Sequence, residues 1–149
     1  MQRQLVLACG NTLRGDDGVG WKIAEALESD PSLSAIRVRI AQQWTPEMAE
    51  EISGFDAVVF VDCSAISEPG TVSVIPVEAA QSSVGSLTHN VTPGSLLAMS
   101  LELYGRIPAR AVAVTVGGKS FELTEELTKP VELAIPRAVD AIQKLLSQG

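Results

Sequence analysis

The feature that most constrains this chain is a glycine-rich turn between an apolar run and a helical pattern near its N-terminus. Residues 5–9 form a continuous apolar run, which is typical of a strand buried on both faces of a parallel sheet. Residues 10–20 then read Gly-Asn-Thr-Leu-Arg-Gly-Asp-Asp-Gly-Val-Gly before the helical pattern begins. Ligands of open α/β sheets gather beyond the carboxyl ends of the strands. The adjacent carboxylates Asp16 and Asp17 are therefore placed for chemistry.

The rest of the chain predicts a three-layer α/β/α fold. Apolar runs predict further strands at 56–62 and 111–116, and alternating patterns predict strands at 71–77 and at 36–40, the latter an exposed or edge strand. Helical patterns predict helices at 18–29, at 45–54, from about 92, and from Pro130 or Pro136 to 146. The strand at 71–77 follows its predecessor without an intervening helix, so we expect it to be antiparallel to it. We predict a mostly parallel five-stranded sheet with one antiparallel strand and helices on both faces. With 149 residues, 46% of them hydrophobic, we expect 1–149 to be a single domain.

Two helix starts carry recognisable signals. Thr45 and Pro46 are typical of an N-cap and a first helical position. Pro93 indicates a first turn just after Thr92, in a helix expected to present one face to the core. The expected members of that face are Leu96, Leu97, Ser100, Leu101 and Tyr104.

Charge and composition exclude several classes of protein. The net charge of −7 and the absence of a Lys/Arg cluster argue against nucleic-acid binding. No apolar run is long enough for a membrane span, and the N-terminal apolar segment is too short for a secretory signal, so we expect a cytoplasmic protein. Cys9 and Cys63 each lie at the end of a strand-like run and are expected to be buried thiols, although they could approach each other if their strands are neighbours.

Three candidate ligands follow three predicted elements. Asp17 lies beyond the first strand, Asp62 ends the strand at 56–62, and His89, the single histidine, lies in a polar loop before a helix. Because parallel strands share an end, both carboxylates should face one crevice, which the loop histidine reaches if the loop folds back. Carboxylate and imidazole suit Zn²⁺, Ni²⁺ or similar ions, and three ligands leave positions open for substrate.

Each candidate also has a plainer interpretation. In the plainer interpretation of the two adjacent acids, Asp16 or Asp17 caps the following helix and complements its dipole. Asp62 simply accepts a hydrogen bond from a loop amide. A lone histidine in a polar loop is usually only solvated.

Competing catalytic motifs are weak. The segment from Ala113 to Ser120 resembles a phosphate-binding loop with alanine in place of the first glycine, but its first half belongs to a strand and no clear helix follows. No nucleophile elbow, His-Glu-x-x-His pair or Cys-His signature is present, which disfavours a serine or cysteine hydrolase. Cys63 beside Asp62 keeps a thiol mechanism as an alternative.

The combined motifs resemble the hydrogenase maturation proteases, which trim the C-terminus of the large subunit of nickel–iron hydrogenases. The resemblance rests on Gly-Asn-x-Leu-x-x-Asp-Asp-Gly-x-Gly at 10–20, on Val61-Asp62 at a strand end, on Ser-Leu-Thr-His at 86–89 before a leucine-containing helix, and on the strand that ends in Gly117. It covers essentially the whole chain. The segment 117–129 departs from the commoner family form, which suggests a subgroup with its own substrate.

The resemblance implies an aspartic-type endopeptidase with Asp17, Asp62 and His89 as catalytic and nickel-recognising residues. Many relatives carry glutamate where this chain has Asp17, whose side chain is one methylene shorter. The nickel is expected to arrive with the partner, a hydrogenase large-subunit precursor, and no organic cofactor is implied. The alternative is a metal-binding maturation factor or sensor without proteolytic activity. The oligomeric state is left open, with a monomer favoured.

Overall fold

The computed structural model describes residues 2–80 and 91–148, in which five strands and four α-helices alternate along the chain except that β4 directly follows β3. Short 3-10 helices η1 and η2 flank the first α-helix. In chain order the elements are β1 (Gln4–Cys9), η1 (Gly15–Gly18), α1 (Val19–Glu28), η2 (Pro31–Leu33), β2 (Arg37–Ala41), α2 (Met48–Ser53), β3 (Ala57–Ser64), β4 (Val72–Pro76), α3 (Pro93–Tyr104), β5 (Arg110–Gly117) and α4 (Lys129–Ser147).

The strands form one sheet in the order β2-β1-β3-β5-β4. Four strands are parallel and β4 runs antiparallel to β5, so the predicted fold class is confirmed. The antiparallel strand does not pair with its predecessor β3, because both edges of β3 are already occupied by β1 and β5. It therefore pairs with the free edge of β5 and ends the sheet.

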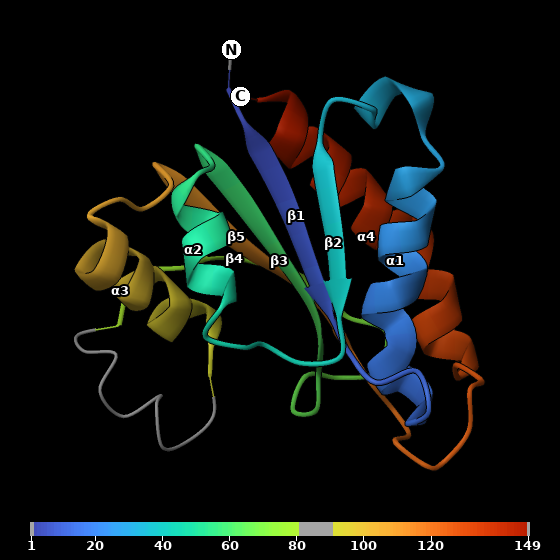
Figure 1. Ribbon diagram of the computed structural model, residues 1–149. Coiled ribbons are helices and arrows are strands. Elements are labelled where there is room, and N and C mark those ends of the chain that lie inside the picture. Colours follow the sequence, from blue (N-terminus) through green and yellow to red (C-terminus); the bar gives the residue numbers. More distant parts are fainter. Residues whose placement is uncertain (1, 81–90, 149) are drawn as a thin grey trace.

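Helices cover both faces of this sheet. Figure 1 shows α1 and α4 on one face and α2 and α3 on the other. Side chains alternate between the two faces along each strand. Val6 and Ala8 of β1 accordingly join the core under α1 and α4, whereas Leu5 and Leu7 join the core under α2 and α3. Burial on both faces explains why this strand reads as an uninterrupted apolar run.

Two predictions about helix ends and faces need correction. The helix predicted from Thr45 begins at Met48, because the amides of Met48 and Ala49 bond to carbonyls only three residues back and form a turn ahead of the α-helix. Thr45 is therefore not its N-cap. On α3, Leu101 and Tyr104 are exposed rather than buried, because residues 101–107 extend beyond the packed part of the helix.

The last helix begins at the earlier of its two predicted positions. Pro130 lies in the first turn, where a missing amide costs nothing, and the helix continues through Pro136. Val131 and Ala134 before that proline and Ala138 after it are fully buried in the same core. We infer that this burial offsets the cost of an interior proline. Among the described residues, no helix combines the length and apolar character needed to cross a membrane.

Candidate active site

Asp17 lies in the 3-10 turn η1, immediately before α1. Its carboxylate Oδ2 accepts a hydrogen bond of 2.8 Å from the amide of Asn11, so the side chain turns back toward the residues that leave β1. Neither η1 nor α1 receives a side-chain capping hydrogen bond, which makes the capping interpretation of Asp16 and Asp17 wrong. The glycine before this turn is required by close packing: a Cβ on Gly10 would lie 2.0 Å from the carbonyl oxygen of Asp17.

Asp62 lies near the carboxyl end of β3, on the face covered by α2 and α3. Its Oδ1 accepts a 2.8 Å hydrogen bond from the amide of Cys63, as the plainer interpretation expected, and lies 3.9 Å from the Sγ of Cys9. Burial raises the pKa of Asp62 to about 6, and the nearby Asp17 carboxylate adds to this, whereas the Cys63 amide opposes it. The side chain is therefore a carboxyl group that titrates close to neutral pH.

The two carboxylates line one small hollow beyond the ends of β1 and β3. This acidic hollow has a volume of about 180 Å³ and is lined by Cys9, Gly10, Asp17, Gln42, Trp44 and Asp62, among others. Val91, which directly precedes the N-cap of α3, also lines it. The arrangement places two acids and a thiol around one small space. His89 lies outside the described residues.

Asp16, the neighbour of Asp17, has a different environment. Its side chain is fully buried, and its carboxylate accepts hydrogen bonds from the amides of Lys119, Ser120 and Thr128 and from the hydroxyl of Thr128. Burial opposes its ionisation, but these hydrogen bonds lower the pKa of Asp16 below its ordinary value. Asp16 thus anchors the segment between β5 and α4 to the turn after β1.

Sequence reasoning missed this anchoring role. The only local signal was the long stretch after Gly117, whose small and polar residues open no helix before Lys129. The same contacts argue against the phosphate-loop interpretation, since the amides of Lys119 and Ser120 already bind the Asp16 carboxylate. A bound phosphate would have to displace a buried anion.

The two cysteines remain free thiols on opposite faces of the sheet. Cys9 follows Leu7 on the face under α2 and α3, whereas Cys63 packs against the core under α1 and α4. Neighbouring strands therefore do not bring the two sulfurs together. Burial raises the pKa of both thiols, that of Cys63 to about 12, and nearby aspartates add to the effect. Neither thiol is activated as a nucleophile.

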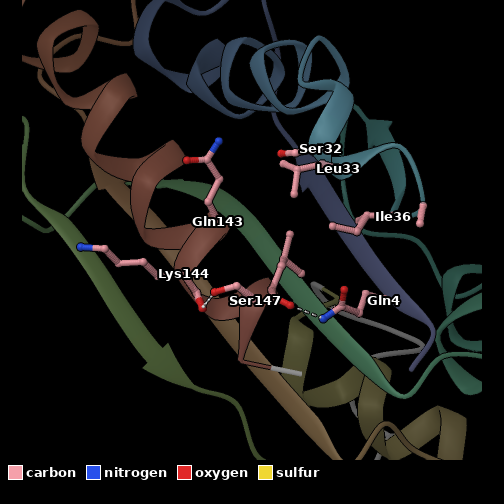
Figure 2. Close-up of a pocket in the computed structure, with 9 residues that line it drawn as sticks. Gln4, Ser32, Leu33, Ile36, Gln143, Lys144 and Ser147 are labelled. Carbon is pink, nitrogen blue, oxygen red and sulfur yellow. Dashed lines mark hydrogen bonds between the residues drawn. The ribbon is translucent and has the colours of Figure 1, made fainter. Parts of the chain in front are cut away.

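A larger hollow of about 600 Å³ lies at the opposite end of the sheet (Figure 2). It is lined by the start of β1, the η2 region and the end of α4, and Gln4 closes one side by donating to the carbonyl of Leu146. Lys144 is the one charged residue among those lining it. This hollow lacks grouped acids or bases, whereas the acidic hollow has two carboxylates and lies beyond the carboxyl ends of parallel strands, so we take the acidic hollow as the candidate site. Within residues 2–80 and 91–148, no three His, Cys, Asp or Glu side chains form a metal-binding group.

Comparisons with known proteins agree with this architecture. A family model described as hydrogenase maturation protease matches residues 40–145. The hydrogenase maturating endopeptidase HybD from E. coli superimposes with a TM-score of 0.75 at 24% identity, over 98% of this chain and 93% of that one. The [NiFe] hydrogenase maturation protease HybD from Thermococcus kodakarensis gives a TM-score of 0.71 at 24% identity, over 96% and 98% of the two chains. No curated protein sequence matches the chain.

Proposed function

Because this chain belongs to the hydrogenase maturation protease family, we propose that it is an endopeptidase that removes a C-terminal peptide from the nickel-loaded precursor of a nickel–iron hydrogenase large subunit. The observation that carries the proposal is the shared acidic hollow of Asp17 and Asp62 at the carboxyl ends of β1 and β3. In this proposal the nickel belongs to the substrate, the reaction takes place in the cytoplasm, and the enzyme acts as a monomer.

Asp17, Asp62 and His89 recognise the nickel in this proposal. Two carboxylates attract a cation electrostatically, and the neutral imidazole of His89 supplies a nitrogen ligand of the kind nickel accepts. Recognition of nickel that the substrate already holds makes cleavage conditional on metal insertion. It also fixes the scissile peptide beside the two acids, which lowers the entropic part of the barrier.

Hydrolysis requires a water nucleophile and a group that accepts its proton. The nucleophile is activated either by a carboxylate or by the nickel that the substrate brings. Asp62 suits proton transfer because its pKa of about 6 lies near the working pH of a neutral compartment. The proton taken from water then passes to the departing amine, so that one peptide bond is broken and the charge balance is kept.

The proposal is tested with a nickel-loaded large-subunit precursor and its metal-free form. Mass spectrometry should show loss of a C-terminal peptide from the nickel-loaded form alone. Processing should be abolished, without unfolding of the chain, by each of the variants Asp17→Asn, Asp62→Asn and His89→Ala. The control variant Asp140→Asn, which changes an exposed acid on α4, should process the precursor normally. Tight binding of an uncut nickel-loaded precursor by the unmodified protein would instead identify a metal-binding maturation factor without proteolytic activity.

A further inference from the structure

A second hollow adjoins the acidic one and shares part of its wall. It has a volume of about 370 Å³ and lies over the carboxyl ends of β1 and β2. Gly10 and Gln42 line both hollows, so the two spaces adjoin at the turn that leaves β1. A polypeptide that lies across this edge of the sheet contacts both hollows.

The second hollow differs from the first in chemistry. None of the residues that line it carries a charge, so we call it the neutral hollow. Its apolar surface comes from Leu13, Trp21, Ile40 and Ala41. Leu13 is 57% exposed, although it lies in the turn beside the candidate site. An exposed apolar side chain at the rim of a concave surface indicates a binding function more strongly than the same side chain on a convex one.

The wall between the two hollows is held in place by hydrogen bonds. The indole Nε1 of Trp21 donates to the carbonyl of Gly10 at 2.6 Å, and the amide of Asn11 donates to Asp17 at 2.8 Å. The side chain of Asn11 also accepts a 2.9 Å bond from the amide of Leu13. The acid of one hollow and the apolar rim of the other are therefore positioned by the same turn.

We propose that the neutral hollow binds an apolar side chain of the substrate polypeptide, next to the segment that carries the metal into the acidic hollow. This inference rests on the proposed function and adds to it a determinant of substrate choice. The volume suits one large or two small apolar side chains, and no charged side chain lines the space to attract a second cation. The acidic hollow thus recognises the metal, and the neutral hollow recognises the polypeptide.

The test compares Leu13→Asp with Leu103→Asp, the same change at an exposed leucine near the end of α3, away from both hollows. Steady-state cleavage of the nickel-loaded precursor should show a KM about tenfold higher for Leu13→Asp, as expected for loss of an apolar contact, with kcat changed less than about twofold. Leu103→Asp should match the unmodified enzyme. Leu13→Ala, a milder change that stays apolar, should raise KM by a smaller factor.

A binding measurement separates this inference from the proposed function. The chain has two tryptophans, Trp21 in the neutral hollow and Trp44 in the acidic one, so fluorotryptophan labelling yields two fluorine NMR signals that Trp→Phe variants assign. Unlabelled nickel-loaded precursor should shift the Trp21 signal. If the precursor is cleaved but KM is unchanged in Leu13→Asp, the proposed function stands and the inference is overturned. If nothing is cleaved, the proposed function fails, and an unmoved Trp21 signal overturns the inference as well.

Discussion

Adjacent aspartates in the turn after β1 have separate roles because they point to different surroundings. The carboxylate of Asp16 is fully buried and receives four hydrogen bonds from the segment before α4. The carboxylate of Asp17 faces the acidic hollow and receives one from Asn11. A buried anion with several donors is stable as a charge, whereas a half-buried one with a single donor remains available to a ligand. Asp16 is therefore a structural acid, whereas Asp17 is the acid that we propose for the site.

Replacement of Asp16 by asparagine should destabilise the protein strongly. The amide group keeps one acceptor but turns an NH₂ toward buried donors, so we expect the free energy of unfolding to fall by about 3 kcal/mol. Because the folded-state pKa of Asp16 is lowered, its contribution is present above the unfolded pKa and is lost as pH falls through the folded value. Denaturant titration of Asp16→Asn near neutral pH measures the effect. A loss below about 0.5 kcal/mol would show that the hydrogen bonds do not stabilise the fold.

Replacement of Asp62 by asparagine should have the opposite effect at neutral pH. The folded-state pKa is raised to about 6, so the wild-type carboxyl is stabilising below its unfolded pKa and this contribution is lost as pH rises through about 6. Asp62→Asn should therefore increase the free energy of unfolding by about 2 kcal/mol near pH 8, and by little near pH 4. Thermal unfolding of both proteins across this range checks the sign, with Asp140→Asn as the control. Equal stability at every pH would contradict the burial of this charge.

At the scale of elements, the beginning of α3 adjoins the acidic hollow through Val91. Thr92 caps the helix through a reciprocal pair of hydrogen bonds with Ser95, one to the amide of each residue, at 3.1 and 2.8 Å. Pro93 then fixes the backbone of the first turn. The chain therefore enters α3 in a defined direction immediately beside the site.

Loss of this cap should weaken α3 measurably. Thr92→Ala removes the acceptor for the Ser95 amide, and we expect the free energy of unfolding to fall by about 1 kcal/mol. Thr92→Ser keeps the hydroxyl and should retain nearly all of the stability. Denaturant unfolding followed by circular dichroism compares the three proteins, and a serine variant as unstable as the alanine variant would show that the hydroxyl is not the stabilising group.

At the scale of the whole molecule, one sheet separates two apolar cores and carries both hollows at one of its ends. Its two faces carry separate apolar clusters, and the carboxyl ends of β1, β2 and β3 bring both hollows to a common edge. We propose that residues 1–149 form a single domain, because each α-helix in the described part of the chain packs on this one sheet (Figure 1). Disruption of either core removes the support of the other.

Unfolding should accordingly be a single cooperative transition. Trp44 packs edge-to-face on Phe60 in one core, whereas Trp21 belongs to α1 on the other face of the sheet. The fluorine signals of the two tryptophans should therefore disappear with the same denaturant midpoint, and circular dichroism should give that midpoint as well. Two separated midpoints would show that the faces unfold independently.

Local patterns were sufficient for the layers, for the directions of all five strands and for the two acids at the site edge. A strand that is apolar on both faces is buried only if helices cover both faces of the sheet, so the continuous apolar runs indicate three layers. Tertiary structure alone decided that β4 pairs with β5, that Leu101 and Tyr104 are exposed, and that Asp16 rather than Asp17 is the buried anchor. Each of these depends on partners remote in the chain, such as Thr128 for Asp16, about which local periodicity carries no information. The role of His89, which lies outside the described residues, stays a prediction.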